Sequence, residues 1–377
     1  MKIMRLTYAA MAFAALLSFS SCSKDDNGDD SLSSKENALQ EVNVNFVDKT
    51  VIPNYKTLAN QSIELEKAME TLRTNMTSEN LEKACTLWRS ARKYWETSES
   101  FLFGAASNYY IDPHIDTWPL DVTALQNLLE SPKMMADIDN VVGNLNYGLV
   151  GFHGLEYIIF RNGNNRPIAE ITENEMNYGV AVAKDLALSC CRLEAAWAGI
   201  DNVTTEKKKI ITDAELEPAD NFGEEMKTCG QAGSRWKSIT AGSEQILEGC
   251  KDIVDEVGNS KIGKPYTGED VNYIESPHSY NSINDFYDNI VGVRNAYFGS
   301  EDATSAQSVS ISAYIRSIDQ TADQDVIDGI ENCLTTINAM PRPFVKNFKD
   351  AKVKEAIDAC NSLYNKLEAA RKVLVNK

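Results

Sequence analysis

The sequence predicts an all-α protein built of two helical-bundle domains. Apolar residues recur three and four positions apart along most of the 377-residue chain, and the alternation typical of strands is nearly absent. About 345 residues follow the N-terminal targeting and tether segments, more than one hydrophobic core commonly holds. We therefore expect domains at 37–205 and 206–377. An aromatic helix ends in Phe-Gly in each half, which hints at an ancient duplication.

The N-terminus is expected to be a lipoprotein signal peptide. Lys2 and Arg5 precede an apolar run over 6–17, too short to span a bilayer, and small residues follow it. Residues 1–21 would be removed, and Cys22 resembles the cysteine that is acylated in bacterial lipoproteins. A plain secretory signal with an incidental Cys22 is the alternative.

Residues 22–36 are expected to form a disordered tether between the lipid and the folded part. The stretch is too polar and too acidic to bury apolar surface. Its Lys24-Asp25-Asp26 start resembles the tag that sends some lipoproteins to the cell exterior. The predicted location is therefore the outer membrane, on its periplasmic face or on the cell surface.

The charge balance limits the kinds of partner. Fifty-five acidic residues face 37 basic ones, for a formal charge of −18 and a pI near 4.7. This excess argues against nucleic acid and against an anionic bilayer surface. It suits a cation, a cationic substrate or simple solubility.

Seven cysteines remain beyond Cys22, an odd number that leaves at least one unpaired in an oxidising compartment. A hairpin turning at 340–343 would offset Cys333 and Cys360 by roughly 13 Å along the helix axis, beyond disulfide reach. Most are expected to be small buried residues. The seven are Cys85, Cys190, Cys191, Cys229, Cys250, Cys333 and Cys360.

Capping residues and breakers divide the chain into elements. In order, we expect a helix over 34–74 kinked at Pro53, a helix over 78–104 behind Thr77, an irregular loop over 104–119, short helices from Asp121 and Pro132, a helix over 144–160, a break at 162–165, a long helix from the capping box Thr172-x-x-Glu175 to about 200, a charged irregular stretch over 201–233, and helices over 235–257, 282–298, 309–319, 321–340 and 344–376.

One apolar segment, residues 149–160, carries a histidine and a glutamate three positions apart. On a helix, His153 and Glu156 project from one face. A helix that is apolar all round is buried, and a buried carboxylate takes up a proton or finds a cation. Gly151 and Gly154 would let another backbone or a ligand approach. The alternative is structural, with Glu156 paired to an arginine and His153 merely hydrogen-bonded.

This segment resembles the imelysin family, whose signature G-x-H-x-x-E matches Gly151-x-His153-x-x-Glu156. The resemblance spans roughly residues 38 to 375 and implies a two-domain all-α fold, an H-x-x-E site near the domain interface, and a role in iron acquisition. The metal-binding part of a ferrous-iron uptake system is similar to this family. The blocks that carry it, in order, are Trp88-x-x-Ala91-Arg92, Glu99-x-Phe101-x-Phe103-Gly104, Trp118-Pro119-x-Asp121, the signature itself, Asp255-Glu256-Val257-Gly258, Lys261-Ile262-Gly263-x-Pro265, Glu275-Ser276-Pro277-x-Ser279 and Arg294-Asn295-x-Tyr297-x-Gly299.

Imelysins are also catalogued as peptidases, an activity that the motifs do not support. A zincin needs H-E-x-x-H, and this sequence has no His-Glu dipeptide and three histidines in all. We assign no catalytic residue. Three hypotheses stay open: a metal-binding protein of iron uptake, a metallopeptidase using the same pair, and a receptor for haem or a siderophore. Oxygen-rich sites with little histidine suit iron, with zinc as the alternative, and favour the first hypothesis.

The expected metal ligands are His153 and Glu156, with Glu99 and His114 as the next candidates. His114 lies in the long loop between two acids, and Glu99 ends an aromatic helix. Arg92 could balance Glu99 or Glu156. The remaining assignments are Asp121 as a helix N-cap, Trp118 and Ser279 as supporting residues of family-like blocks, His278 as an exposed turn residue, and an iron-uptake transporter as a possible partner.

Overall fold

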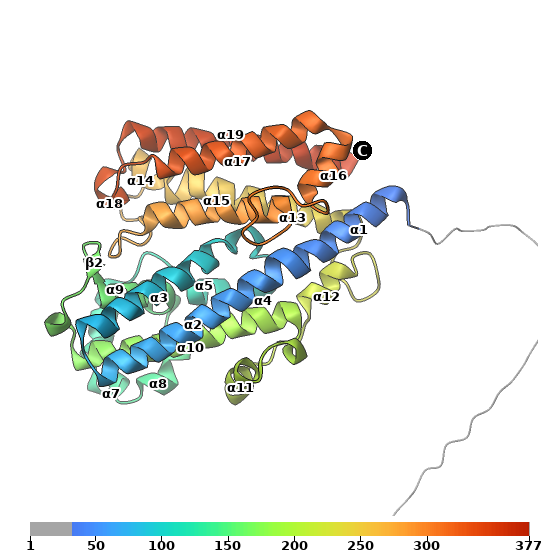
Figure 1. Cartoon of the computed structure of the whole chain (residues 1–377). Coiled ribbons are helices and arrows are strands. Elements are labelled where there is room, and N and C mark those ends of the chain that lie inside the picture. The colour runs from blue at the N-terminus through green and yellow to red at the C-terminus, as the bar shows by residue number, and fades with distance from the viewer. Residues whose placement is uncertain (1–31, 377) are drawn as a thin grey trace, which may run out of the picture.

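The computed structural model describes residues 32–376 (Figure 1). The predicted signal segment 1–21, Cys22 and the first part of the tether lie outside the described residues. The first helix begins at Ser34, behind a capping box of Ser33 and Glu36. The last three residues of the predicted tether, 34–36, are therefore helical. No helix within 32–376 is both long and apolar enough to cross a membrane.

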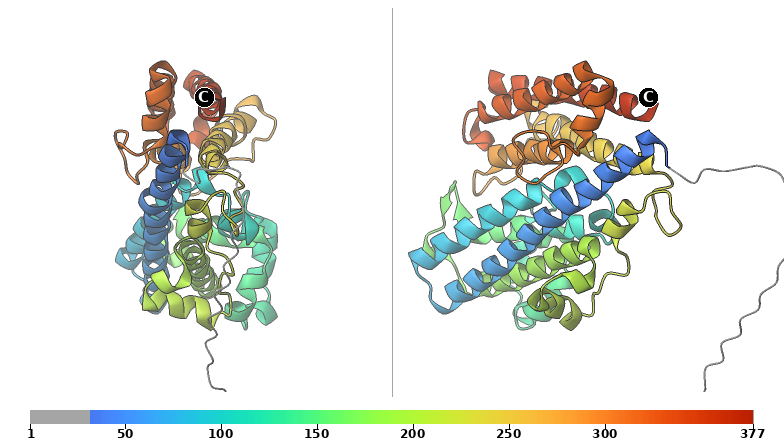
Figure 2. Two further views of the ribbon diagram at one scale, coloured as in Figure 1. Left: turned by 90° about the vertical axis from the view of Figure 1, so that its right-hand side faces the viewer. Right: turned by 45° about the vertical axis from the view of Figure 1, so that its right-hand side comes forward.

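The prediction of an all-α fold is confirmed. Across the described part of the chain, strands occur only in a hairpin of two residues a side, β1 (Phe160–Arg161) and β2 (Asn164–Asn165). The helices form two groups that stack on each other in Figures 1 and 2. The first group comprises α1 (Ser34–Phe46), η1 (Val47–Val51), α2 (Ile52–Thr74), α3 (Ser78–Glu96), η2 (Glu99–Phe101), α4 (Ala105–Asn108), α5 (Ile111–Ile115), α6 (Val122–Leu129), α7 (Pro132–Met135), α8 (Ile138–Val141), η3 (Val142–Asn144), η4 (Tyr147–Leu149), α9 (Gly151–Ile159), η5 (Ile168–Glu170), α10 (Glu173–Ala198), η6 (Ile200–Asn202), α11 (Thr205–Asp213) and α12 (Phe222–Lys227).

The second group is a four-helix bundle with short additions. Its long helices α13, α15, α17 and α19 pack as α13 on α15, α15 on α17, α17 on α19 and α19 on α13. Its elements are α13 (Ile239–Asp255), η7 (Glu256–Lys261), α14 (Gly263–Thr267), α15 (Ser282–Phe298), α16 (Ile311–Ile318), α17 (Gln320–Asn338), α18 (Phe344–Asn347) and α19 (Ala351–Asn376).

The chain crosses from one group to the other later than the predicted boundary at 205/206. In the first group α2 packs between α3 and α10, and α9 lies on α10 and α3. Both α11 and α12 also contact α10, so they belong with this group in space. The passage to the second group comes at α13. The duplication of the two halves stays a prediction.

The predicted kink at Pro53 takes the form of a π-helical turn. Pro53 is the second residue of α2 and has no N–H to donate. In a regular helix its ring would also clash with the carbonyl four residues earlier. The chain widens into η1 directly before the proline, which lets the helix run on towards Thr74.

The helix predicted over 78–104 is shorter, and the expected irregular loop contains α4 and α5. After Glu96, the hydroxyls of Thr97 and Ser98 bond to Asn54 Oδ1 and to the carbonyl of Trp95. Such bonds compete with the regular helical ladder. The 3-10 turn η2 follows at once and carries Glu99 inward.

Beside this turn, two glycines allow the two groups of helices to pack closely against each other. A Cβ on Gly249 of α13 would lie 2.2 Å from the carbonyl oxygen of Ser100. A Cβ on Gly292 of α15 would lie 2.4 Å from that of Thr97. At both glycines, a helix of the second group therefore packs directly on the backbone of residues 97–100, just after α3.

All seven cysteines of the described chain are buried and free, as expected of small apolar residues. Cys333 and Cys360 form no disulfide, as predicted, but the expected offset of roughly 13 Å is wrong, because the thiol of Cys360 lies close enough to raise the pKa of Cys333. The hairpin does not turn at 340–343 alone. The connection runs from the end of α17 at Asn338 to the start of α19 at Ala351 and includes α18, which removes most of the expected offset.

Candidate metal centre

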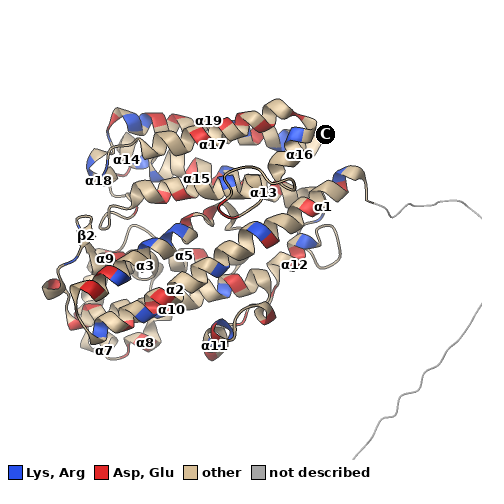
Figure 3. Cartoon of the chain, viewed as in Figure 1, with Lys and Arg blue, Asp and Glu red and all other residues tan. Residues whose placement is uncertain are grey.

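Buried charged side chains gather where the two groups of helices meet. We call this cluster the interface network. Acidic and basic residues are otherwise mixed along the helices of both groups (Figure 3). The first group contributes from α3, η2, α9 and the segment after α5, and the second group contributes from η7, α15 and the segment between α14 and α15. Its members are Arg92, Glu96, Glu99, Asp116, His153, Glu156, Lys261, Glu275 and Asp285, all buried.

The start of α9 is pressed against neighbouring backbone and side chains, which explains its glycines. Gly151 has a φ of +73°, and a Cβ there would lie 2.0 Å from the carbonyl oxygen of Ile115. A Cβ on Gly154 would lie 2.4 Å from the hydroxyl of Tyr178. The two glycines therefore let the start of α9, which carries His153, pack closely against α5 and α10.

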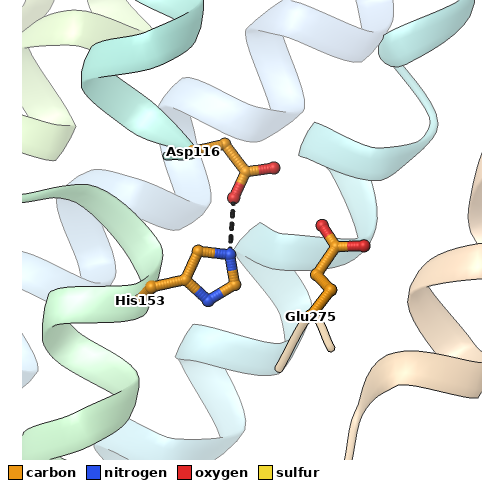
Figure 4. A group of neighbouring side chains, drawn as sticks. All are labelled: Asp116, His153 and Glu275. Carbon is orange, nitrogen blue, oxygen red and sulfur yellow. Dashed lines mark ion pairs between the residues drawn. The ribbon is translucent and has the colours of Figure 1, made fainter. Parts of the chain in front are cut away.

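The imidazole of His153 lies between two carboxylates. Its Nδ1 is 3.2 Å from Glu156 Oε2, and its Nε2 is 3.0 Å from Asp116 Oδ1 (Figure 4). The second contact is an ion pair without hydrogen-bond geometry, so Nε2 has no hydrogen-bond partner. Burial opposes protonation, but the contacts with Asp116 and Glu156 outweigh it and raise the pKa of His153 to about 9. The two carboxylates therefore favour the protonated ring.

Glu156 is held as a carboxylate by the segment between α14 and α15. Its Oε1 accepts hydrogen bonds from the backbone N–H groups of His278 (2.9 Å) and Ser279 (2.7 Å) and from the Ser279 hydroxyl (2.8 Å). Ser276 and Tyr280 bracket this turn with φ values of 48° and 58°. Burial favours the neutral acid, but His153 and the backbone N–H of Ser279 outweigh it and lower the pKa of Glu156.

Arg92 and Lys261 are the permanent cations of the network. Arg92 forms ion pairs with Glu96, Asp116 and Glu275, and does not form the expected pair with Glu156 or Glu99. Lys261 Nζ lies 2.8 Å from Glu99 Oε2 and also contacts Glu96 and Glu275.

Carboxyl groups outnumber the cations. Six carboxyl groups face Arg92, Lys261 and the one histidine. Burial raises the pKa values of Glu96, Glu99 and Glu275 above the ordinary range. The network must therefore hold protons or take up a cation.

Asp116, His153 and Glu275 form a donor set that fits a metal ion. One ligand atom from each lies within 4.8 Å of the other two, and Figure 4 shows the three side chains arriving from different segments. Nitrogen and oxygen donors suit iron and zinc. A metal-binding histidine commonly donates its other ring N–H to a carboxylate. Glu156 stands at that position, on Nδ1.

Of the two other predicted ligands, Glu99 belongs to the interface network and His114 does not. Glu99 belongs to the interface network, where Lys261 and Asn289 bind its carboxylate. His114 lies outside the network, with its Nε2 2.5 Å from Asp185 Oδ2 of α10 and its ring against Tyr147. The structure therefore places Glu99 in the same buried network as His153, whereas His114 pairs with Asp185 outside it.

Of the predicted supporting residues, Trp118 and Ser279 contact members of the interface network, and Asp121 caps a helix. Trp118 lies beside His153, with ring centroids 6.2 Å apart, and Lys261 Nζ is 5.0 Å from the centroid of the tryptophan ring. Asp121 accepts the N–H of Ala124 and caps α6, as expected. Ser279 binds Glu156 as described above.

Sequence reasoning did not identify Asp116, Glu275, Glu96, Lys261 or Asp285 as site residues. Asp116 is one of the two acids that flank His114 in the sequence. Lys261 and Glu275 each open one of the blocks that resemble the imelysin family. The signal was therefore present in those blocks, but only the fold brings them to one point.

A small cavity reaches the network from the side of His153 and Glu156. We call this cavity of 140 Å³ the access pocket. Its wall includes His278, which is half-buried with its ring 5.2 Å from that of Tyr157 and not fully exposed as expected. The lining comprises Trp118, Pro119, Leu120, Val122, His153, Glu156, Asn272, Ile274, Pro277 and His278.

A larger cavity of 590 Å³ lies elsewhere, between α2, α8, α10 and α11. Glu66, Lys184, Asp185 and Asp213 line part of it, and no member of the interface network does. Its size alone does not make it the site, because the convergent buried charges lie at the smaller cavity.

Comparison with known proteins gives consistent relatives. Iron-regulated protein A of Synechococcus elongatus is 27% identical over 312 residues, which cover 83% of this chain and 79% of that protein. The crystal structure of an iron-regulated protein A precursor from Parabacteroides distasonis has a TM-score of 0.80 at 27% identity, covering 90% of this chain and 96% of that one. An imelysin-like protein from Psychrobacter arcticum shares the fold, with a TM-score of 0.61 at 13% identity over 92% of this chain and 95% of the other.

The sequence profile described as Imelysin matches residues 51–372. That range includes every member of the interface network and the whole of the G-x-H-x-x-E signature. The chain belongs to the imelysin family.

Proposed function

We propose that this protein binds iron as its cargo during iron uptake at the cell envelope, and that Asp116, His153 and Glu275 hold the ion. The observation that carries the proposal is the buried donor set of these three residues, in a network with more carboxyl groups than cations. The names of the two 27%-identical relatives, both iron-regulated proteins, support iron. Zinc is the alternative ion.

The neighbouring residues prepare His153 for this role. Glu156 contacts the Nδ1 atom of His153, which leaves the Nε2 atom of the same ring to bind the ion. The backbone N–H groups of His278 and Ser279 in turn hold the carboxylate of Glu156. Nε2 gives up its proton when it binds the ion. Arg92 shares the carboxylates of Asp116 and Glu275, and this competition moderates affinity, as suits a protein that passes its cargo on.

Calorimetric titration of the purified mature protein tests the proposal. Wild type should bind ferrous ion anaerobically, or zinc, at one ion per chain, and the bound ion should raise its melting temperature. His153→Ala should lose both responses. Absence of binding for ferrous, ferric, zinc and manganese ions in the wild type would refute the proposal.

A metallopeptidase using His153 and Glu156 is the competing function. No observation favours it, since one histidine and shared carboxylates make up the donor set. Purified protein is expected to cleave unfolded polypeptides no faster than the His153→Ala variant. Chelator-sensitive cleavage that disappears in this variant would establish the peptidase instead.

We place the protein in the outer membrane as a lipoprotein acylated at Cys22, where an iron-uptake transporter could receive the ion. Cys22→Ala should leave the protein unprocessed or release it from the membrane fraction. A variant that remains membrane-bound at the mature mass would contradict this placement. Protease treatment of whole cells separates surface display from a periplasmic location.

A further inference from the structure

We infer that the access pocket admits only free metal ions, and that the imidazole of His278 is the first side chain to bind them on the way to His153. This inference rests on the proposed function and names the form in which the cargo arrives.

The size of the pocket restricts what can enter. Cavities that hold drug-sized ligands measure roughly 300–1,000 Å³, and the access pocket measures 140 Å³. A volume near 150 Å³ holds about one benzene molecule or a few waters. Haem, a siderophore or a peptide chain is too large, whereas an ion that keeps only some of its water fits.

The lining of the pocket brings ligand groups together on one route. The polar groups are those of His153, Glu156, Asn272 and His278, and the remaining wall is mostly apolar. His278 is half-buried, whereas His153 and Glu156 are almost fully buried. Asn272 is exposed, so an ion coming from solvent meets Asn272 and His278 before the buried pair, and of these two side chains the imidazole is the usual metal ligand.

The local backbone also holds His278 beside Glu156. The backbone N–H of His278 donates to Glu156 Oε1 at 2.9 Å, and its ring packs edge-on against Tyr157, the residue after Glu156. Within residues 32–376 neither ring nitrogen of His278 makes a hydrogen bond. The ring is thus positioned by packing, and its nitrogens stay available for an ion. In His114, by contrast, Nε2 is bound to Asp185.

The larger cavity offers no second route for an iron chelate. At 590 Å³ it has the volume for one. Its wall, however, carries Glu66, Asp139, Asp185 and Asp213 against the single base Lys184. The carboxylates of haem and of many siderophores would be repelled there.

Stopped-flow tryptophan fluorescence with zinc chloride, and anaerobically with ferrous ion, tests the role of His278. His278→Ala should slow association by about tenfold, at the low end of the rate gain from a cleft that concentrates its ion. His278→Asp keeps a ligand at the position and should restore most of the rate. His114→Ala removes a histidine outside the pocket and serves as the matched control, and melting curves verify that each variant is folded.

The outcomes separate this inference from the function on which it rests. Wild-type association rates in a folded His278→Ala variant, while His153→Ala loses binding, would overturn the inference alone. Haemin or a ferric siderophore that competes with zinc for the wild type would also overturn it. Failure of the wild type to bind any of the free ions would overturn both.

Discussion

The two ends of the interface network differ in how they are enclosed. At one end, His153 and Glu156 reach the access pocket. At the other end, Arg92 and Lys261 are sealed among Glu96, Glu99 and Asp285, and none of these side chains lines that pocket. The sealed end neutralises charge and joins the two groups of helices, whereas the pocket end can exchange protons and ions with solvent. One buried cluster thus combines a structural part with an exchangeable part.

Removal of a cation from the sealed end should have the largest effect on stability. Lys261→Met leaves Glu96, Glu99 and Glu275 with less compensation in a buried site. Breaking a buried pair in this way costs about 3–5 kcal/mol, to be measured by urea denaturation. Lys354→Met is the matched control, because Lys354 pairs with Asp358 on the exposed face of α19 and its loss should barely change the unfolding free energy. Equal effects of the two substitutions would remove the distinction between sealed and exposed pairs.

The pocket end should make stability depend on pH. Because the pKa of His153 is raised from 6.5 to about 9 in the folded protein, its stabilisation is fully present below pH 6.5 and is lost as pH rises through 9. The shift corresponds to about 3 kcal/mol. Denaturation in chelator at pH 6 and pH 9.5 should show wild type losing that much more than His153→Gln. Parallel pH profiles for the two proteins would show that His153 is not charged in the metal-free fold.

The close contact between Gly292 of α15 and the backbone of Thr97, beside the sealed end, should not tolerate a larger side chain. In Gly292→Ala the new methyl group would meet the backbone carbonyl of Thr97 at 2.4 Å, and backbone cannot move aside as a flexible side chain can. Overpacking of this kind costs about 1–3 kcal/mol. Gly143→Ala is the control, since its methyl group would find its nearest neighbour at 3.5 Å. A wild-type melting temperature for Gly292→Ala would mean that the two groups are packed less tightly than described.

Much of the fold could be predicted because helix signals are local. The capping box at Thr172 and the helix over 282–298 follow from residues close in sequence. Helix ends set by tertiary bonds could not be predicted in the same way. The end of α3 depends on Asn54, a residue of another helix, and the Cys333–Cys360 contact depends on the path of a 12-residue connection.

The candidate site was predictable only in part, for a similar reason. His153 and Glu156 stand out because they are ionisable residues within an apolar helix. Asp116 and Glu275 lie in irregular segments, where nothing local marks a side chain as buried. The predicted alternative, an arginine paired with Glu156, did not anticipate that backbone N–H groups would hold this carboxylate.

The most direct test of the account is the affinity of Glu275→Gln for ferrous and zinc ions, measured with the binding stoichiometry by calorimetry. Glu275 belongs to the second half of the chain and His153 to the first, so a site at the interface needs both. Asp121→Asn, which can still cap α6, is the control for a lost carboxylate near the site. We predict one ion per chain for wild type and for Asp121→Asn, and affinity reduced by about tenfold or more for Glu275→Gln. Wild-type affinity in a folded Glu275→Gln variant would contradict an ion site built by both halves.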